Sequence, residues 1–109
     1  MKWLKLEVVI PEHDFVEQIK LNGKKLCLVK HKGKLHVLEN SCPHAGGMLS
    51  GGWCKNGNII CPIHRYEYNL DTGRGAAGQN DYIDIYPVEE RADGVYVGLK
   101  ESWIKKLFS

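Results

Sequence analysis

The segment "CPHAGGMLSGGWCKNGNIICPIH" spans residues 42–64 and carries a cysteine and a histidine near each end. Cys42 and His44 form the first pair, and Cys61 and His64 form the second. Thiolate and imidazole are ligands of zinc and of iron–sulfur centres, whereas calcium and magnesium take oxygen ligands. The pattern therefore predicts one site with four protein ligands, which holds either a structural zinc ion or a [2Fe–2S] cluster.

The residues between the two pairs favour the cluster. Gly46 and Gly47 come two and three residues after His44, and Pro43 and Pro62 each follow a ligand cysteine. A glycine lets backbone N–H groups come close to a bound group, and a proline biases the residue before it toward extended geometry. The bridging sulfides of a cluster accept hydrogen bonds, so a glycine-rich loop suits a cluster better than a single ion.

The rest of the chain reads as short strands separated by turns. The turns "NG" and "HKG" predict antiparallel hairpins, and the pattern gives six to nine strands with no alternation of strands and helices. Only residues 101–109 have a helical pattern. We expect one all-β domain over residues 1–109, with an antiparallel sandwich or barrel as its base (1–39 and 73–109) and a loop-rich cluster-binding subdomain inserted at about 40–72. The strand-like runs are "FVEQIKL", "KKLCLVK", "KLHVLEN", "NIICP", "YEYNL", "DYIDIYPVEE" and "GVYVGLK".

The composition excludes several partners. The net charge is +2, from 15 basic and 13 acidic residues without a basic block, so no nucleic acid is expected. The first residues lack the apolar region of a signal peptide, and no run is long enough to span a membrane. We expect a cytoplasmic protein with reduced cysteines, in which Cys27 is a small buried strand residue and Cys54 is a surface or half-buried thiol.

The two boxes, "CPH" and "CPIH" with sixteen residues between them, resemble those of the Rieske [2Fe–2S] family. The longer stretches "CPHAGGMLSGG", "CPIHRYEYNLDTGRG" and "YPVEERADGVYV" are similar to small ferredoxins of bacterial aromatic-ring dioxygenase systems and to the small subunit of nitrite reductase. The resemblance implies that Cys42 and Cys61 bind one iron and that His44 and His64 bind the other. It also implies a one-electron carrier, without catalysis of its own, between a flavin-containing reductase and a terminal oxygenase or nitrite reductase.

Some positions depart from the family pattern. High-potential members link the two loops by a disulfide at positions that hold Gly47 and Ile63 here, so the resemblance implies a lower-potential ferredoxin. Tyr68 matches a tyrosine that donates a hydrogen bond to a ligand cysteine, and Arg65 stands where many relatives have glycine. Two alternatives stay open at this point: the small subunit of an NAD(P)H nitrite reductase, and a zinc-stabilised β interaction module without a redox role.

Overall fold

A computed structural model describes residues 1–43 and 46–99 of the chain. These residues form ten β-strands and one short 3-10 helix, η1, with no α-helix among them, so the all-β prediction is confirmed. Ten strands exceed the six to nine expected, and the predicted helix at 101–109 lies outside the described residues. The elements are β1 Lys2–Lys5, β2 Phe15–Leu21, β3 Lys24–His31, β4 Lys34–Glu39, η1 Leu49–Gly51, β5 Trp53–Lys55, β6 Asn58–Ile60, β7 Glu67–Asn69, β8 Ile85–Tyr86, β9 Val88–Arg91 and β10 Gly94–Leu99.

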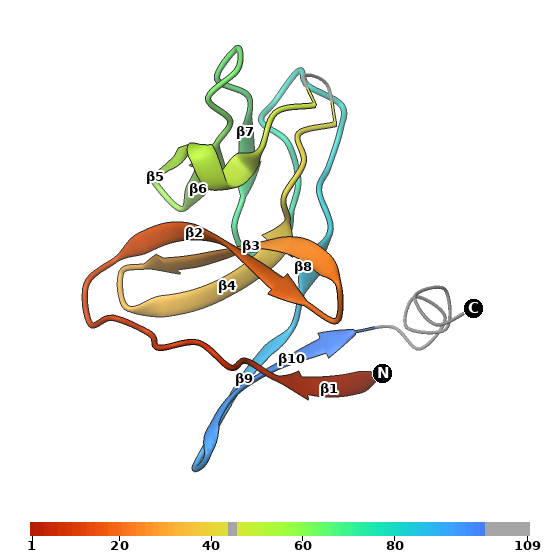
Figure 1. The fold of residues 1–109 in the computed structure, drawn as a ribbon. Helices are drawn as coiled ribbons and strands as arrows, with labels where there is room; N and C mark the ends of the chain where they lie inside the picture. Colours follow the sequence, from red (N-terminus) through yellow and green to blue (C-terminus); the bar gives the residue numbers. More distant parts are fainter. Residues whose placement is uncertain (44–45, 100–109) are drawn as a thin grey trace.

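A four-stranded antiparallel sheet in the order β2-β3-β4-β8 crosses the middle of the molecule (Figure 1). The turns predicted from the sequence join its first three strands. Asn22 and Gly23 have φ angles of 55° and 84°, and Lys32 and Gly33 have φ angles of 52° and 78°. Two-residue hairpin turns need such positive angles because their backbone twist then matches that of the strands. Asn and Gly tolerate this conformation well, which explains why the sequence signal was clear.

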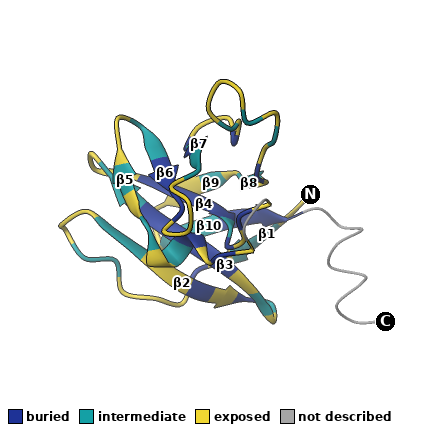
Figure 2. Cartoon of the chain, turned by 90° about the horizontal axis from the view of Figure 1, so that it is seen from above, coloured by how far each residue is buried: buried dark blue, intermediate teal, exposed yellow. Residues whose placement is uncertain are grey.

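The central strand β3 is buried on both faces. Leu26 and Leu28 belong to one cluster of buried side chains, whereas Cys27 and Val29 belong to another. Successive side chains of a strand point to opposite faces, so this run of four buried residues contributes to two cores. Dark blue segments in the middle of Figure 2 mark this buried centre. The four-stranded sheet therefore separates the molecule into two packed regions.

The first region packs a three-stranded antiparallel sheet, β1-β10-β9, against the Leu26 and Leu28 face. Its register pairs Lys2 with Leu99. Val97 and Leu99 are fully buried there. Burying such an aliphatic side chain stabilises a fold by about 1.5–3 kcal/mol. We call this region the base core, and its side chains are mostly aliphatic.

The second region contains a small antiparallel sheet, β5-β6-β7, which lies on the opposite side of the β2–β8 sheet from β1, β9 and β10 (Figure 1). The loops around it extend away from the base core. Hydrogen bonds from Asn69 N to Arg74 O and from Ala76 N to Glu67 O attach the following segment to β7. The predicted subdomain of residues 40–72 contains this sheet, and its boundaries stay a prediction. We call the second region the loop core.

Candidate metal centre

The first predicted ligand box forms a tight loop around Cys42. The backbone N–H of Cys42 donates to Gly47 O at 2.9 Å, and Gly46 N–H donates to Cys42 O at 2.8 Å. Gly46 has a φ of +66°, a conformation that favours glycine. The Cys42 side chain is buried. His44, the second predicted ligand, lies outside the described residues.

The second box forms a turn that presents His64 to solvent. Cys61 is buried, and its N–H donates to Tyr66 O at 2.8 Å. His64 and Arg65 have φ angles of +59° and +56°. This left-handed conformation costs an ordinary side chain roughly 1–2 kcal/mol, which explains why glycine suits the Arg65 position. The His64 side chain is exposed, and its ring contacts that of Tyr66 edge to face.

The structure brings the two cysteines together from the separate loops. Their side chains form a hydrogen bond, and burial is the main cause that raises the pKa of the Cys61 thiol. The backbone N–H of Ile63 also bonds to the Cys61 sulfur and opposes this rise in the pKa. Both cysteines are free of disulfides. Two adjacent soft sulfur donors with an N–H group beside them fit an iron–sulfur centre.

The two loops touch at Gly47 and Ile63, the two positions at which the resemblance implies that this chain lacks a disulfide. A Cβ atom placed on Gly47 would lie 2.8 Å from Ile63 Cδ1 and 3.3 Å from Cys61 Sγ. Glycine therefore leaves space that the Ile63 side chain fills next to the Cys61 sulfur. Among residues 1–43 and 46–99, no three His, Cys, Asp or Glu side chains gather closely enough to hold a metal ion. The complete set of four ligands therefore stays a prediction.

Tyr68 lies beside Cys42 at the centre of the loop core. Its side chain is fully buried, and its Oη lies 3.3 Å from Cys42 Sγ. The same hydroxyl donates a hydrogen bond of 2.6 Å to Asp81 Oδ2. Burial, followed by the hydrogen bond to Asp81, raises the pKa of Tyr68 far above its usual range, so the phenol keeps its proton. The role of Tyr68 as a donor to a ligand sulfur stays a prediction.

Sequence reasoning missed Asp81 and its neighbour Gln79. Both lie in the segment between β7 and β8, which folds back beside β7, as Figure 1 shows. Backbone bonds hold this segment in place, from Gly75 N to Asp81 O at 2.9 Å and from Ile83 N to Gly73 O at 2.8 Å. No local pattern in the sequence signals a contact that depends on this return of the chain.

The remaining two cysteines lie on strands outside the two ligand boxes, although they pack in the same buried cluster as Cys42 and Cys61. Cys27 is buried within β3, as predicted, and Cys54 is half-buried on β5. Burial is the main cause that raises the pKa of Cys27 to about 12 and that of Cys54 to about 11. Both thiols therefore stay protonated at neutral pH, and protonated thiols are poor metal ligands.

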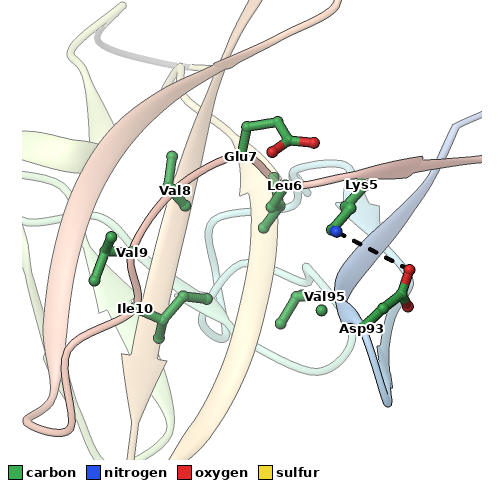
Figure 3. A pocket seen from close by; sticks show the side chains of 9 residues that line it. Lys5, Leu6, Glu7, Val8, Val9, Ile10, Asp93 and Val95 are labelled. Atoms are coloured by element: carbon green, nitrogen blue, oxygen red, sulfur yellow. Dashed lines mark ion pairs between the residues drawn. The ribbon is translucent and has the colours of Figure 1, made fainter.

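A pocket of about 450 Å³ lies in the base region, next to the ion pair between Lys5 and Asp93 (Figure 3). Cys42, Cys61 and His64, the predicted ligands among the described residues, do not line it. Among the described residues, no helix is long and apolar enough to cross a membrane.

Comparison with known proteins identifies one family and several similar proteins. Residues 5–87 match the family model described as the Rieske [2Fe-2S] domain. The ferredoxin component of a naphthalene 1,2-dioxygenase system from Pseudomonas aeruginosa is 31% identical over 101 residues, which cover 90% of this chain and 96% of that protein.

Two solved structures share the fold at lower identity. A chain in a structure described as a complex of reduced oxygenase and oxidized ferredoxin in carbazole 1,9a-dioxygenase has a TM-score of 0.72 and 23% identity, over 87% of this chain and 100% of that chain. A putative NADH-dependent nitrite reductase small subunit from Mycobacterium tuberculosis has a TM-score of 0.69 and 20% identity, over 91% of this chain and 96% of that chain.

Proposed function

The chain belongs to the Rieske [2Fe-2S] family, and from this premise we propose that it carries one electron at a time from a flavin-containing reductase to a terminal oxygenase. Its cofactor is a [2Fe–2S] cluster, which supplies a one-electron couple when bound. The proposed ligands are Cys42, His44, Cys61 and His64. The observation that carries the proposal is the meeting of two buried thiols, Cys42 and Cys61, from separate loops.

The described residues of the site include both buried side chains and one exposed side chain. Cys42 and Cys61 are buried, so water has little access to their sulfur atoms. Gly47 leaves room beside the Cys61 sulfur. Exposed His64 lies on a turn at the surface, where a partner protein has access to its ring. We therefore propose the His64 side of the loop core as the route by which the electron leaves.

The proposed partners follow from the relatives. The naphthalene dioxygenase relative is named as the ferredoxin component of an oxygenase system, and it matches this chain over nearly its whole length. A carrier with this role needs no catalytic residues of its own, because its partners perform the chemistry. We place the chain in the cytoplasm as part of the same proposal, because a cluster held by cysteine thiolates needs cysteines that are kept reduced.

The sequence leaves two alternatives open, a nitrite reductase small subunit and a zinc-stabilised module, and the comparisons support them to different degrees. The nitrite reductase small subunit has the same fold at 20% identity. A likeness in fold at this identity does not indicate that the two proteins bind the same partner. Purification of a tagged chain from its own cells separates these options, because a nitrite reductase would remain bound as a permanent large subunit. A zinc module without a redox role conflicts with the match to the Rieske [2Fe-2S] family. A purified chain that is colourless and contains zinc would support this alternative again.

Electron transfer tests the proposed function directly. The chain is reduced without oxygen and mixed with a purified terminal oxygenase of the aromatic-ring type, and the visible absorption is followed in a stopped-flow instrument. We expect reoxidation of the chain together with reduction of the oxygenase, and we expect the ligand variant Cys61→Ser to transfer no electron. A loaded, reduced chain that exchanges no electron with any oxygenase or reductase of this class would contradict the proposal.

A further inference from the structure

The hydroxyl group of Tyr68 lies between two possible acceptors. Its Oη is 3.3 Å from Cys42 Sγ and 2.6 Å from Asp81 Oδ2. A phenol carries one hydrogen, and a cysteine bound to a metal is a thiolate without a hydrogen to donate. When Cys42 is a ligand, the single phenol hydrogen therefore points either to the sulfur or to the carboxylate, and the other neighbour faces an oxygen lone pair.

The amide of Gln79 determines which oxygen of the Asp81 carboxylate accepts each hydrogen bond. The N–H of Glu67 donates to Gln79 Oε1 at 3.0 Å, and a backbone N–H acts only as a donor. The amide orientation is therefore fixed, and Gln79 Nε2 donates to Glu67 O at 3.2 Å and to Asp81 Oδ1 at 3.1 Å. Asp81 thus accepts one bond from Gln79 on Oδ1 and one from Tyr68 on Oδ2.

This pattern favours the carboxylate as the acceptor of the phenol hydrogen. Donors on both oxygens suit an ionised carboxylate, which is an acceptor only. A distance of 2.6 Å from Tyr68 Oη to Asp81 Oδ2 is typical of an O–H group bonded to an anion, and such bonds are about twice as strong as neutral ones. The geometry therefore favours a phenol hydrogen on the Asp81 side, away from Cys42, in place of the donor role that the resemblance implies for Tyr68.

Gly75 makes room for this arrangement. A Cβ atom on Gly75 would overlap Asp81 Oδ1 and would lie 2.8 Å from Gln79 Nε2. The N–H of Gly75 also donates to the backbone oxygen of Asp81 at 2.9 Å. The glycine thus fixes the backbone at Asp81 and leaves space for its side chain to reach Tyr68.

We propose that Asp81 holds the hydroxyl hydrogen of Tyr68 away from Cys42 and thereby keeps the reduction potential of the cluster low. The inference rests on the proposed role of Cys42 as a ligand. A hydrogen bond to a ligand sulfur stabilises the more negative reduced state, and a hydroxyl turned toward Asp81 withholds that bond. Asp81 acts through Tyr68 and is a positioning residue.

The variant Asp81→Asn reverses the direction of the phenol hydrogen. Gln79 Nε2 continues to require an acceptor, so the new amide places its oxygen toward Gln79 and its NH₂ group toward Tyr68. The phenol oxygen then accepts a bond, and its hydrogen turns to the Cys42 sulfur. We expect the reduction equilibrium to shift about tenfold toward the reduced state, which is about 59 mV for a one-electron couple.

A double-mutant cycle separates this effect from the loss of the Asp81 charge. In the unchanged chain, Tyr68→Phe removes no donor to Cys42, so the potential stays the same or rises. In the Asp81→Asn background, Tyr68→Phe removes a donor, so the potential falls. The charge of Asp81 is absent from both proteins of the second pair, and it therefore cancels from the comparison. Asp84→Asn, an exposed acid on the same segment, measures the effect of a charge change alone.

Protein-film voltammetry of the four proteins gives the result, after iron content and visible absorption have shown that each is loaded. A potential that stays the same or rises for Tyr68→Phe in the unchanged chain, together with a fall in the Asp81→Asn background, supports the inference, and the absence of a fall in that background contradicts it. A fall of the potential in the unchanged chain overturns it, whether or not Asp81→Asn folds. A wild-type chain without iron would instead contradict the proposed function. Gly75→Ala, whose Cβ displaces the carboxylate, is expected to raise the potential by the same route.

Discussion

The base core and the loop core lie on opposite faces of one sheet but are held together differently. The base core consists of aliphatic side chains such as Leu28 and Val97, which pack by volume and carry no directional bonds. The loop core instead places two cysteines, a buried tyrosine and a polar network in direct contact. A change in the base core should therefore lower stability, whereas a change at Cys42, Cys61 or the polar network beside Tyr68 should alter the metal centre itself.

Replacing a cysteine of the two predicted ligand boxes should have the largest effect. We expect Cys61→Ser to lose the cluster, because a hydroxyl is a hard ligand that replaces a soft thiolate. Cys27→Ser is the matched control, since Cys27 lies in the same buried cluster but within β3. Iron and sulfide analysis of the purified variants measures the outcome. Loss of iron from Cys27→Ser with retention in Cys61→Ser would reverse the ligand assignment.

Removing volume from the base core should affect stability alone. Leu28 is 1% exposed, and Leu28→Ala should lower the free energy of unfolding by about 2–5 kcal/mol because it leaves a cavity. The potential of the loaded variant should match that of the unchanged protein. Urea unfolding and voltammetry of the same preparation measure both quantities. A large shift of the potential would show that the two cores are not separate in function.

Gly51 and Gly52 are adjacent glycines of the loop core whose replacement by alanine should have different effects on stability. A Cβ on Gly52 would overlap the backbone oxygen of Ile60, whereas a Cβ on Gly51 would meet Pro62 Cγ at an ordinary 3.7 Å. Gly52→Ala should therefore lower the free energy of unfolding by about 1–3 kcal/mol, as overpacking does. Gly51→Ala should change it by no more than about 0.5 kcal/mol. Equal unfolding midpoints for the two variants would contradict the close packing of η1 on β6.

His36 on β4 connects the two regions and should give the smallest effect. Its ring bonds to the backbone of Leu70 in the loop core, and burial, partly opposed by Asp71, lowers its pKa. Because the unfolded chain then binds a proton more readily than the folded chain, stability is full above the unfolded pKa of about 6.5 and decreases as the pH falls below it.

Urea unfolding at about pH 7.5 and about pH 5.5, on either side of that ordinary histidine value, measures this slope. His36→Gln should show a smaller difference between the two conditions than the unchanged chain. His13→Gln, at an exposed position, is the control and should keep the full difference. A difference that persists in His36→Gln would assign the slope to other groups.

The sequence predicted the parts of the molecule that local signals encode. The turn at Asn22 and Gly23 and the buried apolar run of β3 both follow from short patterns, and the four predicted ligands follow from box spacing. Strand β1 was missed because its partner, β10, lies at the other end of the chain. Asp81 was missed for a similar reason, since its bond to Tyr68 exists only after the segment before β8 folds back.

The electron paramagnetic resonance spectrum of the reduced protein tests most directly whether two cysteines and two histidines hold the cluster. Nitrogen ligands on one iron lower the average g value below that of a cluster held by cysteines alone. We predict a spectrum with this lowered average g value, and its loss in Cys42→Ser and Cys61→Ser. An average g value equal to that of an all-cysteine cluster, or a reduced protein without such a signal, would contradict the ligand set of Cys42, His44, Cys61 and His64.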